Sequence, residues 1–175
     1  PQTRNRVIIS GFKNEAAASA FKPKTISREG VDLTVRGAIG HLPQPVFFSR
    51  SLSADDIPTH PNHWTMTPRS KRFKGETAAP APTRSFRRLS WDKPSPTVAY
   101  GHREIHVHPD GARRLSIYEA MLLQGFPRSF VLEGTLSQQV EQVSNAVPPP
   151  VARSLAAATS TALTTSASAT QTVTA

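Results

Sequence analysis

The segment Arg113–Pro127 constrains the fold more than any other part of the chain. Ser116 can cap the first turn of a helix, Glu119 three residues later completes a capping box, and Gly125 followed by Pro127 ends the helix. Apolar side chains recur at helical spacing and form a broad stripe. We therefore predict a short helix with most of its surface buried, which on these grounds is a packing element rather than an active site.

Composition and charge limit the classes of partner. The 175 residues include 16 prolines and carry a net charge of +9, from 21 Lys and Arg against 12 Asp and Glu. This balance favours a polyanionic partner, with nucleic acid ahead of an anionic membrane surface. No run reaches the roughly eighteen apolar residues of a spanning helix, so we expect no membrane partner. The absence of cysteine excludes disulfides, zinc-thiolate sites and a thiol nucleophile within these residues.

Near the start, Gln2, Arg4 and Arg6 alternate before the apolar run Val7–Phe12. Such a run predicts a strand buried on both faces, with the arginines at its entrance on one side of the backbone. The alternative is a surface cluster that flanks a strand. Residues 13–30 are expected to form a polar loop, and a short helix over 33–40 should follow.

The middle of the chain, from Pro43 to about Pro96, has little periodicity and much proline. Aromatic residues interleave with its basic residues, a pattern that suits contacts to a nucleic-acid backbone and its bases. The alternative is a loop region whose aromatics form a small core. The candidate DNA-binding residues here are Arg69, Lys71, Arg72, Lys74, Arg84, Arg87 and Arg88.

Beyond this region, residues 105–108 alternate and run into Pro109-Asp110-Gly111, which predicts a strand and a tight turn. His106 and His108 share one strand face, but no third ligand follows at a recognisable spacing, so we predict no metal site.

Two helices are predicted after Pro127. Thr135 and Gln138 form a capping signature for a helix over 136–143. Prolines at 148–150 then begin a last helix, because a first turn tolerates prolines. From about Thr159 the chain is mostly Ser, Thr and Ala, which predicts a disordered tail.

Three motifs in one order resemble those of the DNA cytosine-5 methyltransferases, especially bacterial restriction-modification enzymes. Gln2-x-Arg4-x-Arg6 resembles the eighth of the family's ten motifs, Arg113–Pro127 the ninth, and Asn145-Ala146-Val147-Pro148-Pro149 the tenth. The resemblance covers residues 1–157. It implies an α/β fold, a partial Rossmann-like methyltransferase core with a loop-rich mixed target recognition domain.

The resemblance also implies a division of the chain. Residues 1–42 would end the catalytic core, 43–105 would form the target recognition domain, and 106–157 would return to the core. Residues 158–175 remain as the tail. Thr97, followed by Val98, matches the dipeptide with which the family contacts the DNA backbone beside the target base.

The chemistry implied by the resemblance needs more than this chain contains. The family's enzymes flip the target cytosine, add a cysteine thiolate to carbon 6 and use a glutamate at the ring nitrogen. No cysteine, Gly-rich cofactor loop or Glu-Asn-Val motif is present. Arg6 would face the cytosine carbonyl oxygen, while Arg4 and Gln2 would orient its neighbours.

The cofactor implied by the resemblance is S-adenosyl-L-methionine, bound in part by Asn145, Ala146 and Val147. One departure is Ser144, where the family usually has glycine before the asparagine.

Two hypotheses follow. The chain is either the C-terminal portion of a DNA cytosine-5 methyltransferase or a non-catalytic DNA-binding module, a degenerate remnant of one. In the first case its partners are double-stranded DNA and an N-terminal methyltransferase half, on the same longer chain or a separate subunit. That half would supply the cysteine, and this chain would be inactive alone, in the cytoplasm at a bacterial nucleoid.

Overall fold

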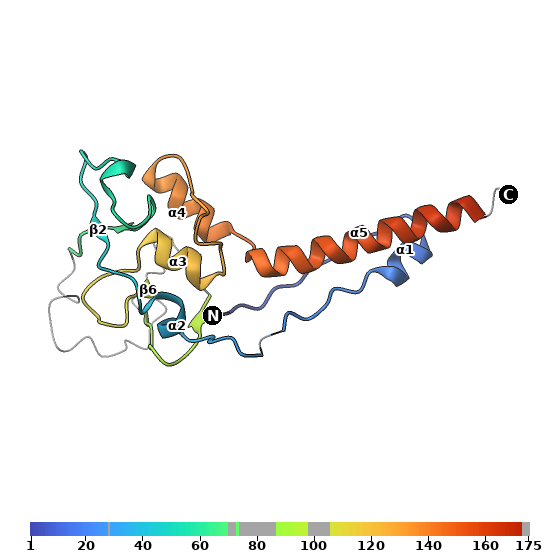
Figure 1. Cartoon of the computed structure of the whole chain (residues 1–175), viewed down its shortest axis with the longest axis horizontal. Coiled ribbons are helices and arrows are strands. Elements are labelled where there is room, and N and C mark those ends of the chain that lie inside the picture. The colour runs from blue at the N-terminus through green and yellow to red at the C-terminus, as the bar shows by residue number, and fades with distance from the viewer. Residues whose placement is uncertain (28, 70–72, 74–86, 98–105, 173–175) are drawn as a thin grey trace. The chain divides into compact units, whose positions relative to one another are not determined.

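The computed structural model describes residues 1–27, 29–69, 73, 87–97 and 106–172. This part of the chain is a mixture of helices and short strands (Figure 1). In chain order these are β1 (Gln2–Thr3), α1 (Glu15–Ala20), α2 (Val35–Ile39), β2 (Val46–Phe47), the 3₁₀ helix η1 (Ala54–Asp56), β3 (Trp64–Thr65), β4 (Arg87–Arg88), β5 (Ser95–Pro96), β6 (His106–Val107), α3 (Ile117–Leu123), α4 (Leu136–Asn145) and α5 (Pro149–Thr172). The strands form three parallel pairs, β1 with β5, β2 with β3, and β4 with β6.

The chain divides into two compact units. The first comprises Pro1–Arg4 and Gly30–Ala146, and the second comprises Asn5–Glu29 and Val147–Ala175.

The core of the first unit is built around α3, which lies between α2 and α4 (Figure 1). All seven residues of α3 are buried, and Val35, Ile39 and Val143 from the neighbouring helices belong to the same apolar cluster. The prediction of a short helix with most of its surface buried is confirmed.

Local signals also placed the neighbouring helices correctly. Thr34 caps α2, which begins two residues later than the predicted 33–40, and Gly40 is its C-cap. Thr135 and Gln138 form the expected capping box of α4, although this helix continues to Asn145, two residues beyond the predicted end. After α3, Gly125 has a φ of 78°, a conformation that glycine adopts without steric cost and that ends the helix.

The strand and turn predicted after residue 105 are also present, although Ile105 itself lies outside the described residues. Strand β6 leads into a turn in which the Gly111 N–H donates to the His108 oxygen at 2.8 Å. Gly111 has a φ of 82°, and a Cβ there would lie 3.2 Å from the guanidinium carbon of Arg88. The conformation therefore favours glycine, and a Cβ would also require the flexible Arg88 side chain to shift.

The strand predicted over Val7–Phe12 is wrong. Val7 and Ile9 are 89% and 93% exposed, and no strand includes them. A strand buried on both faces needs neighbouring strands to pair with its backbone and layers above and below. The three strand pairs in the described part of the chain offer neither to these residues.

The loop predicted over 13–30 contains a helix, α1. Asn14 caps it by accepting the Ala17 N–H at 2.8 Å, and Ala17 packs in the second unit against α5. The signal was an asparagine followed by Glu15 and three alanines, which are good helix formers behind a good cap.

The disordered tail predicted over 158–175 is also wrong, because α5 continues through these residues to Thr172. The last three residues lie outside the described part of the chain. Threonine hydroxyls of α5 donate to the carbonyl one turn earlier, as Thr159 does to Leu155 at 2.9 Å. Such bonds satisfy the polar side chains within the helix. Ala158 and Ala162 are buried, so packing adds to the helix propensity of alanine. Among the described residues, no helix is long and apolar enough to cross a membrane.

Candidate functional site

The N-terminus of α3 carries a buried ion pair. Ser116 Oγ accepts the Glu119 N–H at 3.0 Å, and Glu119 Oε2 accepts the Ser116 N–H at 2.7 Å, which completes the predicted capping box. The same carboxylate receives both terminal nitrogens of Arg113 at 2.8 Å. Both side chains are buried, and each charge is compensated by the other in this bidentate pair.

Arg113 also connects α3 to the segment after α2. Its Nε donates to Gln44 Oε1 at 3.0 Å, and Nη1 donates to the backbone oxygen of Arg114 at 3.0 Å. The guanidinium group thus joins the start of the predicted recognition domain to the ninth motif.

His63 makes a second connection to the same place. Its Nδ1 lies 2.9 Å from Ser116 Oγ and its Nε2 lies 2.9 Å from the Pro43 oxygen. A carbonyl oxygen only accepts, so Nε2 carries a proton and donates to the Pro43 oxygen. Both ends of segment 43–63 are therefore held at the first turn of α3.

Sequence reasoning missed a buried amide pair centred on Asn62. Its Nδ2 donates to the Leu132 oxygen at 2.8 Å and to Gln139 Oε1 at 3.0 Å, while its Oδ1 accepts the Leu132 N–H at 2.8 Å. Trp64 Nε1 donates to the same Gln139 oxygen at 3.0 Å. No local pattern could reveal these contacts, because the partners lie about seventy residues apart in the sequence.

Two buried histidines in this unit have altered acidity. Burial lowers the pKa of His60, which stacks on Tyr118 with ring centroids 3.9 Å apart. Burial also lowers the pKa of His108, although Glu119 partly opposes this effect. His108 Nδ1 lies 2.9 Å from Asp110 Oδ2, within the turn after β6. No group of three potential metal ligands occurs among the described residues.

We expect acid to destabilise the first unit through these two histidines. A histidine whose pKa is lower in the folded state is protonated first in the unfolded state, so stability is complete above about pH 6.5 and falls as the pH drops toward the folded pKa. Urea unfolding at pH 8 and pH 5.5 should show this loss, and His60→Gln/His108→Gln should reduce the difference between the two values. An equal difference in the wild type and the double variant would contradict the assignment.

The first strand pair brings together two of the predicted site residues. Gln2 lies opposite Ser95 in the parallel pair of β1 with β5, and Thr97 Oγ1 donates to the Thr3 oxygen at 3.3 Å. Both amide atoms of Gln2 are buried without a hydrogen-bond partner among the described residues. Thr3, which lies within the eighth motif, is therefore bonded to the threonine that the resemblance assigned to the DNA backbone, 94 residues away in sequence.

The arginines of the eighth motif differ in their surroundings. Arg4 is half-buried and belongs to the first unit with Gln2. Arg6 belongs to the second unit, is exposed, and donates to the Asn5 oxygen at 3.2 Å. The structure thus places Gln2 beside the segment that bears Thr97, whereas Arg6 is exposed.

The predicted cofactor residues follow the last turn of α4. Asn145 is its final residue and is exposed, while Ala146 turns the chain with φ and ψ of −57° and 139°. Val147 is 57% exposed and begins the second unit. These residues can offer an amide side chain and backbone groups to a ligand.

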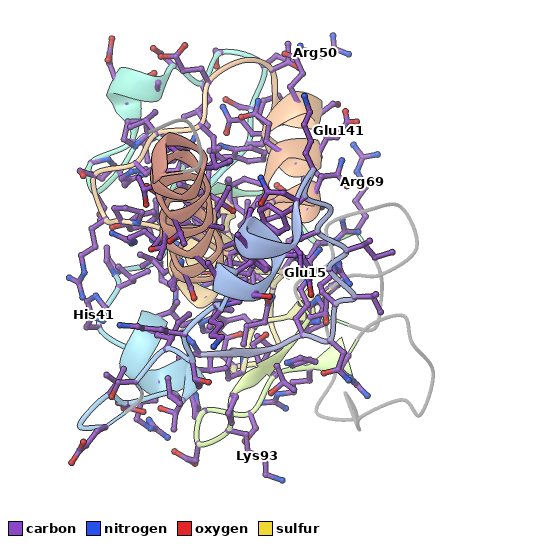
Figure 2. All side chains as sticks on the ribbon, turned by 90° about the vertical axis from the view of Figure 1, so that its right-hand side faces the viewer. Glu15, His41, Arg50, Arg69, Lys93 and Glu141 are labelled. Atoms are coloured by element: carbon purple, nitrogen blue, oxygen red, sulfur yellow. The ribbon has the colours of Figure 1, made fainter. Side chains whose placement is uncertain are left out.

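Only part of the predicted basic cluster can be described. Arg69 and Arg87 are exposed, and Arg69 projects from the surface (Figure 2). Arg88 is also exposed, but its Nε donates to the Pro109 oxygen at 2.6 Å, so it holds the turn after β6. Lys71, Arg72, Lys74 and Arg84 lie outside the described residues.

The family is shown by comparison with known proteins. A family model described as C-5 cytosine-specific DNA methylase matches residues 1–161. The chain therefore belongs to this family, as its three ordered motifs predicted. The mixed α/β structure is consistent with a domain of such a methyltransferase.

The relatives include bacterial, archaeal and plant DNA methyltransferases. Type II methyltransferase M.NmeDI from Neisseria meningitidis is 27% identical over 85% of this chain and 40% of its own length. M.MthTI from Methanothermobacter thermautotrophicus is 30% identical over 89% of this chain and 51% of its own. DNA (cytosine-5)-methyltransferase CMT3 from Arabidopsis thaliana is 46% identical, over 44% of this chain. The chain thus spans about half or less of the length of these relatives.

Proposed function

We propose that the chain is the C-terminal, DNA-recognising portion of a DNA (cytosine-5-)-methyltransferase. The complete enzyme transfers a methyl group from S-adenosyl-L-methionine to carbon 5 of cytosine within a specific sequence of double-stranded DNA at the bacterial nucleoid. The observation that carries this proposal is the pairing of β1 with β5, which joins Gln2 to the segment that bears Thr97. A binding module alone has no need for a catalytic motif at this position.

The proposal includes the division of the chain that the resemblance implies. Residues 1–42 and 106–157 belong to a Rossmann-like catalytic core, and residues 43–105 form the target recognition domain. Arg113 and His63 attach the beginning of that domain to α3 through Gln44, Glu119 and Ser116. In this account the ninth motif performs no chemistry and holds the recognition domain on the core.

The proposed catalytic roles are electrostatic. Arg6 donates to the carbonyl oxygen of the flipped cytosine, where negative charge accumulates as the ring is attacked. Its guanidinium group stays protonated at every relevant pH, so it needs no activation. Arg4 and Gln2 orient the neighbouring groups. The buried amide of Gln2 has no hydrogen-bond partner among the described residues, so it is available to a partner brought by DNA or by the rest of the enzyme.

The exposed residues at the end of α4 carry polar groups of the kind that the proposed cofactor needs. Asn145 offers an amide, and the turn at Ala146 and Val147 offers backbone groups, which can recognise the polar edges of S-adenosyl-L-methionine. Bound there, the cofactor would supply the methyl group. The nucleophilic thiolate and the glutamate come from the N-terminal part, on the same longer chain or on a separate subunit.

We expect Arg69 and Arg87, the exposed arginines of the basic cluster, to bind DNA phosphates. Each phosphate contact releases condensed counterions, so affinity should fall steeply with salt, and Arg69→Ala/Arg87→Ala should reduce the slope of log K against log salt by about 2. Fluorescence anisotropy with a labelled duplex between low and moderate salt measures this slope. Arg128→Ala is the control, because Arg128 is exposed in the same unit and outside the basic cluster. An unchanged slope in the double variant would remove these residues from the interface.

A further inference from the structure

A buried amide beyond α3 holds the last turn of α4. Gln124 follows α3 and is 2% exposed, and its Nε2 donates to the backbone oxygen of Val143 at 2.6 Å. The last four carbonyl groups of a helix have no partner within the helix. Val143 is the third residue from the end of α4, so Gln124 supplies a donor that the helix lacks.

The chemistry of the contact sets the orientation of this amide. A backbone carbonyl oxygen only accepts, so the nitrogen of Gln124 must face Val143. Its Oε1 is then buried without a hydrogen-bond partner among the described residues. Leaving a buried acceptor unpaired is unfavourable, and an apolar side chain of equal length would avoid that cost. Among the described residues, the donation to Val143 is therefore the polar contact that this buried amide makes.

Other contacts make α4 a fixed support for the residues that follow. The Val143 side chain is fully buried, and Ser144 Oγ donates to the Val140 oxygen at 2.8 Å. Toward the other end, Gln139 is held by Asn62 and Trp64. The exposed Asn145 lies two residues beyond the Val143 carbonyl that Gln124 binds. Its position therefore depends on the last turn of α4, which the contacts of Val143 and Ser144 hold in place.

We propose that Gln124 is a positioning residue for the Asn145–Ala146 turn and, through it, for S-adenosyl-L-methionine. The inference rests on the proposed function, in which this turn contacts the cofactor. Gln124 acts through Val143 and does not touch the ligand. A displaced turn weakens cofactor binding without changing the groups that contact DNA, because binding groups act only within a narrow geometry.

Steady-state methylation by the assembled enzyme, this chain with its N-terminal part, tests the effect on the cofactor. Gln124→Met removes the donor and keeps the length of the side chain. We expect the KM for S-adenosyl-L-methionine to rise about five- to tenfold, as for one lost hydrogen bond, with the KM for DNA unchanged within about twofold. Gln142→Met is the matched control, because Gln142 on the same helix donates to the Glu133 oxygen at 3.0 Å but is exposed. It should change neither KM.

Hydrogen exchange of the 175-residue chain gives a readout that needs no activity. In Gln124→Met, amides 143–145 should exchange faster while those of Met121–Leu123 stay protected. Equal acceleration throughout α3 would make Gln124 a general support of the core and overturn the proposal. Unchanged exchange, or an unchanged cofactor KM, would also overturn it. If the wild-type assembled enzyme transfers no methyl group, the proposed function fails, while the exchange measurement still decides whether Gln124 holds the turn.

Discussion

Arg113→Met should lower the free energy of unfolding of the first unit by about 3–5 kcal/mol. The substitution leaves the carboxylate of Glu119, which is 1% exposed, without its bidentate partner. It also removes the bond to Gln44 that connects α3 with segment 43–63. Urea unfolding followed by tryptophan fluorescence measures the loss, because both tryptophans, Trp64 and Trp91, lie in this unit.

Two control variants separate the cost of leaving the buried Glu119 carboxylate unpaired from the cost of losing an ion-pair contact. The exposed pair of Arg36 with Asp92 has a similar separation of 3.0 Å, but its side chains are 58% and 77% exposed. Arg36→Met should therefore cost less than about 1 kcal/mol. Arg113→Met/Glu119→Met should recover much of the loss, since no buried charge remains. Equal losses in the two single variants would show that burial of the pair is not what matters.

The helices around this ion pair could be predicted because their signals are local. Ser116 with Glu119 and Thr135 with Gln138 each bring cap and partner within one turn, and Gly40 and Gly125 mark helix ends. Helical spacing of apolar residues then identified the buried face. The same locality explains why the family could be inferred from three short motifs.

The site could be predicted only in part because its contacts are distant in sequence. Nothing near Asn62 reveals that it binds Leu132 and Gln139, and strands of two residues leave no periodic pattern. The errors at Val7–Phe12 and in α5 have a related cause. An apolar run forms a buried strand only where neighbouring strands can pair with its backbone. A polar tail forms a helix where another helix buries its alanines, as α1 does for α5.

We predict that the 175-residue chain alone transfers no methyl group to cytosine. Carbon 5 is a poor nucleophile until a thiolate adds to carbon 6, and this chain has no cysteine. In its proposed role, Arg6 stabilises charge on the carbonyl oxygen of the ring but cannot form that covalent bond. Adding the proposed N-terminal part should restore transfer in a radiolabel assay, and changing the cysteine proposed as its nucleophile to alanine should abolish transfer again. DNA binding by this chain should survive in both cases.

The most direct test of the account is transfer of labelled methyl groups from S-adenosyl-L-methionine to duplex DNA by three samples. These are this chain, the proposed N-terminal part, and the two together. The account predicts incorporation at cytosine carbon 5 only when both are present. Incorporation by this chain alone would contradict it. So would no incorporation by two folded and associated parts, which would instead favour a DNA-binding remnant without catalytic function.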